Sequence, residues 1–395
     1  MSGEDPFDLI QSLATDETVR ENPYSAYALA RSFGEVIRVE DGFYLATSYS
    51  AVDQVLRGQA FGKHPIADNN PRRSTFDPSY PLSMLFLDPP EHTRLRRSVV
   101  SFFTPSKIQL LEPTISRSTA KLFETLISNG GGDIVEDVAV KLPISVIADM
   151  LGVSTDEHEG LREEVAILAR SLDIGPGSRD AVKDTLDAAG ISLLSFFTDL
   201  IENKPAGSTL LSSLLEGPNP LSVKEAAVMA MLLFIAGFET TSNLIGSMVH
   251  QLLSDDVLCE RVLDPNTNLA NVVEEFLRLE SPVQLDGRVV HSDVLVAGTE
   301  LKVGNFVLTL IGGANRDPAV FSNPDQYDFT RSGKSVMSFG AGIHHCVGAA
   351  LARSEARVFL EHFVKLPRPR LVTAERKPSL TLRGFKKVEI KLSVD

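Results

Sequence analysis

The stretch from Phe339 to Gly348 constrains this chain more than any other part of it. It holds Cys346, one of 2 cysteines in the sequence, between glycines at 340, 342 and 348. Glycine tolerates backbone angles that a Cβ atom forbids, so a tight loop is allowed here. Residues 349–360, which follow, combine strong helix formers with apolar residues at helical spacing. We therefore predict that Cys346 lies in a tight loop at the N-terminus of a helix.

This position suits a metal-binding sulfur. The unpaired N–H groups and the positive end of the dipole at a helix N-terminus favour a thiolate over a thiol, and a thiolate is a soft ligand for iron. A buried, unreactive cysteine is the simpler alternative. A zinc site built from His344, His345 and Cys346 is a weaker one, because three consecutive side chains point in different directions and only Cys259 remains as a second thiol.

The stretch resembles the cysteine loop of the cytochrome P450 family, whose pattern is Phe-x-x-Gly-x-His-x-Cys-x-Gly. The fixed positions are occupied by Phe339, Gly342, His344, Cys346 and Gly348. The resemblance implies that Cys346 is the axial ligand of haem b (iron protoporphyrin IX) and that His344 donates a hydrogen bond to a haem propionate. It also places Phe339 and Gly340 in the cofactor-binding loop, where Phe339 keeps water from the sulfur.

The same resemblance implies a mainly α (α+β) fold, the cytochrome P450 fold, with a large helical lobe, a smaller β-rich lobe and the haem buried between them. An Asp-Gly turn between two β-prone runs in 36–47 predicts a hairpin. The 395 residues, 43% of them hydrophobic, are enough for a large core. We expect a single domain over 1–395 with no fused reductase, so that electrons arrive from a separate protein.

The charge of the chain limits its partners. The net charge is −14, from 38 Lys and Arg against 52 Asp and Glu, which disfavours nucleic acid and anionic membranes. An unpaired thiol ligand suits a reducing compartment. The N-terminus has no signal-peptide pattern, and the longest apolar run, Ala226 to Phe238, is too short to span a bilayer. We expect a cytoplasmic monomer without membrane or nucleic-acid partners.

A long helix is predicted from the capping box of Ser222 and Glu225 to about Ser254. Because residues 226–238 are all apolar or glycine, this helix is expected to be buried on nearly all sides. Glu239, Thr240 and Thr241 interrupt it, and burying such groups unpaired costs free energy. Gly237 costs a further ~1 kcal/mol relative to alanine. A sequence that accepts both costs is expected to use these residues.

Residues 236–241 resemble the oxygen-binding groove of the family, small-Gly-x-acid-Thr. The resemblance places Ala236 and Gly237 against the cofactor, assigns Thr240 to steadying bound oxygen, and assigns Glu239 to a relay that brings protons from solvent. The pair favours molecular oxygen and two external electrons over direct use of hydrogen peroxide. The simpler alternative is a threonine bonded to the carbonyl four residues earlier and a glutamate turned to solvent.

A basic pair is predicted on the helix that begins near Asp88. His92 and Arg96 are four residues apart and share one face, so two cationic donors need an anion or form a solvated basic face. In the family, His-x-x-x-Arg on this helix binds haem propionates, and Arg288 matches a third propionate donor. The hypothesis for electron supply is a basic patch that docks an acidic ferredoxin, itself served by a ferredoxin reductase; the alternative is scattered surface arginines. The patch would consist of Arg94, Arg97, Arg353 and Arg357.

A long polar loop, 62–87, is expected to be functional, and in the family it roofs the substrate pocket. A second break, at 175–177, falls near the mobile lid of the family. The predicted substrate contacts are Phe61, Met84, Leu85, Val283, Leu285 and Phe385. For the residues at the loop, plain loop padding is an equal alternative.

Glu275 and Arg278 are three residues apart on a predicted helix and resemble the scaffold pair of the family, which Arg331 completes. Their expected role is structural: a buried charge network that positions the cysteine loop. Together, these motifs imply a haem-thiolate monooxygenase that activates O2 and hydroxylates or epoxidises an apolar small molecule of terpenoid, steroid, fatty acid or polyketide type. A non-catalytic haem-thiolate sensor or carrier is the alternative, although it would need no proton relay. A zinc hydrolase is a third.

Overall fold

The computed structural model describes residues 5–64, 79–154, 160–169, 183–203, 209–216, 219–333 and 335–393. Two sequence predictions fall partly or wholly outside this range. They are the middle of the long polar loop, 65–78, and the break at 175–177.

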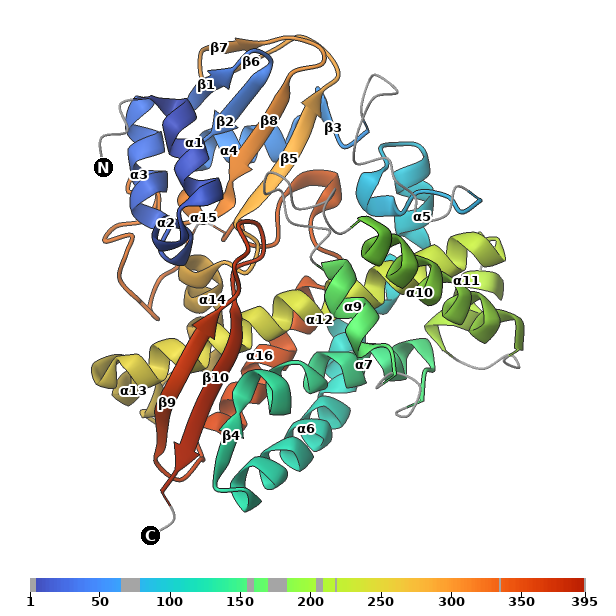
Figure 1. Ribbon diagram of the computed structural model, residues 1–395, viewed down its shortest axis with the longest axis vertical. Coiled ribbons are helices and arrows are strands. Elements are labelled where there is room, and N and C mark those ends of the chain that lie inside the picture. The colour runs from blue at the N-terminus through green and yellow to red at the C-terminus, as the bar shows by residue number, and fades with distance from the viewer. Residues whose placement is uncertain are drawn as a thin grey trace.

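A five-stranded sheet forms the smaller, β-rich lobe (Figure 1). Its order is β1-β2-β8-β5-β3, with β2 and β8 parallel and the other pairs antiparallel. The predicted Asp-Gly hairpin joins its first two strands. The strands and the helices that accompany them are β1 (Val36–Glu40), β2 (Phe43–Ala46), β3 (Phe61–Gly62), β5 (Leu285–Val290), β8 (Phe306–Leu310), α1 (Pro6–Thr15), α2 (Glu17–Glu21), α3 (Tyr24–Phe33), α4 (Tyr49–Arg57) and α15 (Ile311–Ala314).

The larger lobe is helical and is crossed by α12 (Figure 1). Its helices are α5 (Glu91–Val99), α6 (Pro105–Ser128), α7 (Lys141–Leu151), α9 (Arg162–Ala169), α10 (Lys183–Asn203), α11 (Leu210–Glu216), α12 (Val223–Ser254), α13 (Asp256–Leu263), α14 (Leu269–Glu280) and α16 (Ala349–Phe363). Short turns of helix lie at η1 (Met84–Phe86), η2 (Val100–Phe102), η3 (Val135–Ala139) and η6 (Gly342–His344). Two small sheets complete the fold: β4 (Gly131–Asp133), β10 (Phe385–Leu392) and β9 (Pro369–Arg376); and β6 (Val294–Val296) with β7 (Thr299–Leu301).

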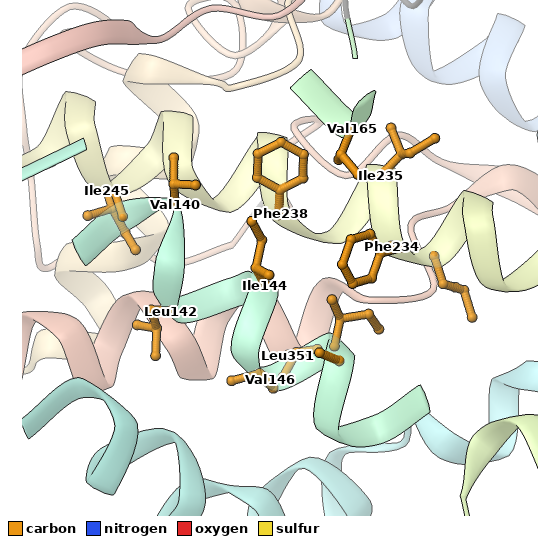
Figure 2. Close-up of a cluster of buried hydrophobic side chains, with 14 of the residues drawn as sticks. Val140, Leu142, Ile144, Val146, Val165, Phe234, Ile235, Phe238, Ile245 and Leu351 are labelled. Atoms are coloured by element: carbon orange, nitrogen blue, oxygen red, sulfur yellow. The ribbon is translucent and has the colours of Figure 1, made fainter. Parts of the chain in front are cut away.

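Helix α12 begins with the predicted capping box: the Ser222 hydroxyl accepts from the Glu225 N–H, and the Glu225 carboxylate accepts from the Ser222 N–H. Figure 2 shows Phe234 and Phe238 of this helix packed with Ile144 of α7 in the main core. Each such burial stabilises the fold by roughly 1.5–3 kcal/mol. Within the described residues, α12 alone is long and apolar enough to cross a membrane, and 78% of its most apolar window is buried inside the protein. It is the central core helix of the lobe.

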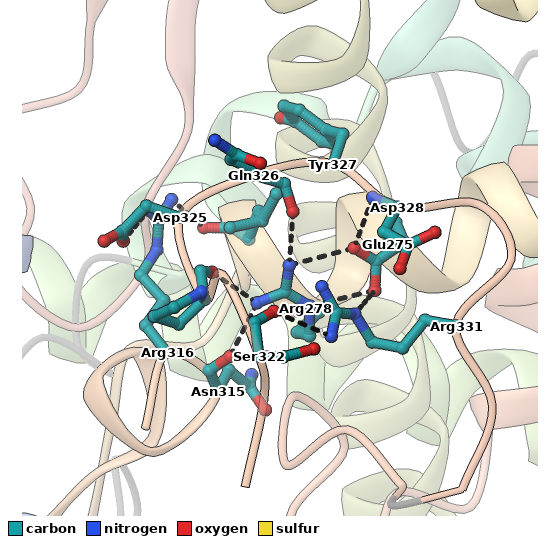
Figure 3. A network of polar contacts seen from close by, with 12 residues as sticks. Glu275, Arg278, Asn315, Arg316, Ser322, Asp325, Gln326, Tyr327, Asp328 and Arg331 are labelled. Atoms are coloured by element: carbon teal, nitrogen blue, oxygen red, sulfur yellow. Dashed lines mark hydrogen bonds and ion pairs between the residues drawn. The ribbon is translucent and has the colours of Figure 1, made fainter. Parts of the chain in front are cut away.

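A buried ion-pair network joins α14 to the irregular chain that precedes the cysteine loop (Figure 3). Arg278, fully buried, donates to both carboxylate oxygens of Glu275 at 2.9 Å, and Arg331 Nε donates to Glu275 Oε1 at 3.1 Å. Arg278 Nη1 also donates to the Asn315 carbonyl at 3.0 Å. The structure therefore brings together the three residues that the sequence placed in one network.

Asn315 carries this network to the start of the cysteine loop. Its side-chain oxygen accepts from the Met337 N–H at 2.7 Å, and its side-chain nitrogen donates to the Ser338 hydroxyl at 2.8 Å. Ser338 in turn donates to the Leu277 carbonyl of α14 at 2.5 Å. The backbone directly before Phe339 is thereby fixed to a buried helix.

Candidate active site

A cavity of about 340 Å³ lies between α12 and the cysteine loop. The middle of α12 lines one wall, and the loop from Phe339 to Gly348 lines another. Residues of α5, η1 and the start of β5 close it. Ala236 is exposed and Gly237 is half-exposed in the middle of an otherwise buried helix, because the cavity opens at that point.

The cysteine loop adopts a tight conformation that needs glycine. Gly342 has a φ of +70°, and a Cβ atom there would overlap the carbonyl oxygen of Leu56 in α4. The Cys346 N–H donates to the Phe339 carbonyl at 2.8 Å, which closes the loop. Helix α16 begins after Gly348, as predicted. The Cys346 side chain is exposed, but its exposure is to the cavity that it lines.

Opposing effects act on the pKa of Cys346. Burial raises the pKa of the Cys346 thiol above its usual value, although the Gly348 N–H and the charges of Arg96 and Arg353 lower it. The backbone N–H of Gly348 at the helix N-terminus therefore favours the thiolate, while desolvation opposes it. A bound metal cation would further stabilise the thiolate, since a coordinating thiol is deprotonated.

Unpaired donors gather at one end of the cavity. His92 and His344 lie with ring centroids 4.2 Å apart, and His92 Nδ1 and His344 Nε2 are buried without hydrogen-bond partners. The nearest carboxylate oxygen to His344 Nε2, from Asp88, is 3.8 Å away, too far for a hydrogen bond. Burial lowers the pKa of His92 to about 4 and also lowers the pKa of His344. Both rings are therefore neutral at neutral pH, and each can carry its one N–H on the nitrogen that has no partner.

Arg96 lies beside these rings, lines the cavity, and donates from Nη2 to the His345 carbonyl at 2.6 Å. This donor set, with two orphaned ring nitrogens and a guanidinium, matches the carboxylates of a propionate-bearing cofactor. The residues present therefore fit a haem, and Cys346 lines the same cavity.

Arg288 is paired within its own strand. Arg288 is buried and donates from Nη1 to Asp286 Oδ2 at 2.6 Å and to the Gly287 carbonyl at 2.9 Å. The residues that line the cavity here are Asp286 and Lys63, which form an ion pair. Burial raises the pKa of Asp286, but the charges of Arg288 and Lys63 outweigh burial and hold this pKa well below its usual range. Arg288 thereby fixes the Asp286 carboxylate, which lies two residues away on the same strand. A role of Arg288 toward a propionate stays a prediction.

The polar break in α12 lies where the sequence placed it. Glu239 and Thr240 line the cavity together with Ala236 and Gly237. The Thr240 hydroxyl donates to the Ala236 carbonyl at 3.1 Å, so this part of the simpler alternative is present. The other part is wrong, because Glu239 is not turned to solvent: it is 7% exposed and accepts from Lys377 Nζ at 2.6 Å and from Asn243 Nδ2 at 3.3 Å.

Glu355 of α16 is a cavity residue that the sequence analysis missed. It is 2% exposed, and its Oε1 atom has no hydrogen-bond partner. Burial raises its pKa from 4.5 to about 8, although a hydrogen bond with Thr241 lowers it. Nothing in the sequence distinguishes it from a glutamate on the polar face of a surface helix.

The predicted substrate contacts divide into two groups. Met84, Leu85, Val283 and Leu285 line the cavity. Phe61 does not, because its strand pairs with β5 and its ring packs in the cluster beneath the five-stranded sheet. Phe385 does not either, because its ring stacks on His250 of α12 with centroids 4.4 Å apart. Further apolar lining comes from Leu232, Leu233, Ile235, Ile311 and Leu382.

The zinc alternative finds no support in the described ranges. No three histidine, cysteine, aspartate or glutamate side chains converge there as a metal site, so His344, His345 and Cys346 do not share one ion.

Comparison with known proteins gives a consistent result. The sequence profile of the family described as cytochrome P450 matches residues 267–383. The chain is 31% identical over 386 residues to the biotin biosynthesis cytochrome P450 of Bacillus subtilis (strain 168), covering 95% of this chain and 94% of the relative. Its fold is similar to that of P450BioI in complex with an acyl carrier protein ligated to hexadec-9Z-enoic acid, with a TM-score of 0.88, 30% identity, and coverage of 95% and 99%.

The fold is also similar to that of CYP109E1 from Bacillus megaterium in complex with testosterone, with a TM-score of 0.87, 30% identity, and coverage of 96% and 100%. The chain belongs to the cytochrome P450 family. It is accordingly a monooxygenase that binds haem b, and the predicted α+β fold is confirmed.

The buried carboxyl of Glu355 makes stability depend on pH. The unfolded chain releases this proton near pH 4.5, whereas the folded protein keeps it to about pH 8, so the stabilisation is present in full below pH 4.5 and is lost as the pH rises toward 8. Glu355→Gln removes this dependence. Relative to wild type, its free energy of unfolding should therefore rise by roughly 2–4 kcal/mol from pH 5 to pH 8.5, measured by urea unfolding of the holoprotein.

Glu375→Gln, at an exposed position on β9, is the matched control and should show no such gain. Parallel pH dependence of the wild type and Glu355→Gln would contradict the assignment.

Proposed function

We propose that Cys346 ligates the haem iron and that the enzyme oxidises an apolar small molecule bound in the cavity that Cys346 lines. The observation that carries this proposal is that one cavity has a sulfur on one wall and the pair Glu239 and Thr240 on another. When bound, a haem with a thiolate ligand supplies the chemistry that cleaves O2 and transfers one oxygen atom. The protein residues described below position the substrate and manage protons.

His92, Arg96 and His344 would hold the cofactor by its carboxylates, because a ring nitrogen of each histidine is buried without a partner and all three residues line the cavity. Phe339 and Gly340, with Ala236 and Gly237 opposite, form the walls against the cofactor. Arg288 assists by fixing the Asp286 carboxylate. Glu275, Arg278 and Arg331 act at a distance, since Asn315 connects them to the residues that precede the loop.

Thr240 and Glu239 manage protons at the cavity. The Thr240 hydroxyl is directed to a helix carbonyl and can rotate to donate into the cavity, while the neighbouring Glu239 carboxyl can hold a proton beside it. A sensor or carrier has no need of such a pair, which disfavours that alternative.

The substrate is proposed to be an apolar molecule of terpenoid, steroid, fatty acid or polyketide type, which the enzyme hydroxylates or epoxidises. Met84, Leu85, Val283 and Leu285 supply an apolar wall that excludes water and orients such a molecule. The steroid and fatty acyl ligands named for similar structures are consistent with this class. We further propose one domain over 1–395, acting as a cytoplasmic monomer.

A ferredoxin, served by a ferredoxin reductase, is the proposed electron donor. The predicted basic patch is weaker than the sequence indicated, because three of its arginines are paired with glutamates: Arg94 with Glu91 and Glu225, Arg353 with Glu274, and Arg357 with Glu112 and Glu361. Arg97 is exposed and lies on α5, next to the arginine that contacts the cysteine loop. We propose that Arg97 is the main cation of the docking surface.

The assignment of the haem ligand predicts a spectroscopic result. Reduced protein under carbon monoxide should show a Soret band at the long-wavelength position typical of thiolate ligation. Cys346→Ser should lose that band, whereas Cys259→Ser, which changes a half-buried cysteine on α13, should retain it. A long-wavelength band in Cys346→Ser would refute the assignment.

The assignment of Thr240 predicts uncoupling. Without its hydroxyl, proton transfer at the cavity fails more often, so Thr240→Ala should release roughly tenfold more hydrogen peroxide per O2 consumed. The assay uses ferredoxin-driven turnover with a saturating apolar compound selected by its binding spectrum. Ser242→Ala, whose hydroxyl bonds only within the helix to the Glu239 carbonyl, is the control. Equal peroxide yields from Thr240→Ala and wild type would remove Thr240 from the mechanism.

The docking proposal predicts a salt-dependent defect. Arg97→Glu should slow ferredoxin-driven reduction by roughly tenfold at low ionic strength, and the defect should shrink at high salt, because surface charges mainly steer association. Arg370→Glu, on β9 and far from α5 (Figure 1), is the matched control. Stopped-flow reduction measures both. A rate and salt dependence like those of wild type would exclude Arg97 from docking.

A further inference from the structure

Lys377 lies directly after β9, and its side chain reaches α12. Its ammonium group donates to Glu239 Oε1 at 2.6 Å and to Asn243 Oδ1 at 3.0 Å. Asn243 Nδ2 donates to the same Glu239 oxygen at 3.3 Å. The side chains of Lys377, Glu239 and Asn243 therefore form a closed triangle of hydrogen bonds, in which Glu239 takes part through Oε1.

The backbone around Lys377 keeps this contact close. The Lys377 N–H donates to the Gly384 carbonyl at 3.1 Å, so residues 377–384 form a closed turn against α12. A Cβ atom on Gly384 would overlap the Asn243 side chain, so only glycine lets the turn approach the helix at this distance. The position of the lysine is thus set by main-chain packing as well as by its ion pair.

Lys377 is more exposed to solvent than Glu239, its partner in the ion pair. The Glu239 side chain is 9% exposed and lines the cavity, whereas the Lys377 side chain is 24% exposed. Asn243 is buried and its amide has no proton to give up. Among the described residues, Lys377 is the one titratable group whose side chain is hydrogen-bonded to the Glu239 carboxylate.

We propose that Lys377 is the outer member of the proton relay and carries protons from solvent to Glu239. This proposal rests on the proposed function of Glu239 and Thr240. In the transfer, an N–H bond of the ammonium breaks as an O–H bond forms on Glu239 Oε1, which leaves a neutral amine and a carboxylic acid. The amine then takes a proton from hydronium at the surface, and water is left. One proton moves inward and no electrons move.

A purely structural role is the competing explanation, in which Lys377 only clamps the turn 377–384 to α12. Two variants separate the roles. Lys377→Met removes both the charge and the transferable proton. Lys377→Arg keeps the charge and the hydrogen bonds, but a guanidinium does not release its proton in a protein. If Lys377 is only a clamp, Lys377→Arg should behave like wild type. If Lys377 carries protons, Lys377→Arg should fail as Lys377→Met does.

The experiment measures hydrogen peroxide released per O2 consumed by the holoenzyme, with the same ferredoxin-driven assay and apolar compound for every variant. We expect Lys377→Met and Lys377→Arg both to raise this ratio by roughly fivefold or more. Lys386→Met, which removes an exposed lysine of β10 paired with Glu375, is the control and should leave the ratio unchanged. A ratio like wild type in Lys377→Met, or its restoration in Lys377→Arg, would overturn the relay.

A second measurement does not depend on turnover. Urea unfolding of wild type, Glu239→Gln, Lys377→Met and the double variant gives a double-mutant cycle, and the two substitutions should be non-additive because the side chains are in direct contact. Additive effects would overturn the pair itself. Thr240→Ala is assayed in parallel: if it stays coupled, the proposed function fails, whereas if it uncouples while both Lys377 variants stay coupled, only the role of Lys377 fails.

Discussion

The ion pair between Arg278 and Glu275 is the interaction on which the rest of the site depends. Arg278 is fully buried, and its guanidinium donates to Glu275 and to three backbone carbonyls, so every one of its N–H donors is used. Removing one partner of such a pair leaves an uncompensated buried charge, at a cost of about 3–5 kcal/mol. Through Asn315, the pair sets the backbone immediately before the cysteine loop. This buried charge network therefore helps to position the Cys346 sulfur.

The protein also has to keep polar groups inside an apolar core without leaving them unpaired. Along α12, apolar side chains hold the helix in place, and the polar pair Glu239 and Thr240 lies where the helix meets the cavity. There, Glu239 is paired with Lys377 and Thr240 with a helix carbonyl. His92 and His344 remain orphaned, and this is the signature expected of groups whose partner is a cofactor.

The sequence predicted what depends on local spacing. The capping box of α12, the shared face of His92 and Arg96, and the pair Glu275 and Arg278 lie within one or two helical turns, so periodicity alone places them. The structure is needed where segments far apart in the sequence meet. Lys377 contacts Glu239 from 138 residues away, and Lys63 pairs with Asp286 from 223 residues away. Phe61 and Phe385 have side-chain directions fixed by strand pairing and by stacking, which composition does not encode.

The close approach of Gly342 to Leu56 has a consequence for altering this enzyme. Because the cysteine loop touches the backbone of α4 with no room for a methyl group, the floor of the cavity cannot sink or shift without moving the β-rich lobe. The roof is different, since Met84 and Leu85 come from a short turn of helix at the edge of a long polar loop. New substrates would therefore be accommodated by changes at Met84 and Leu85, while the cysteine loop stays unchanged. Substrate selectivity can thus change in this fold without a change in the chemistry.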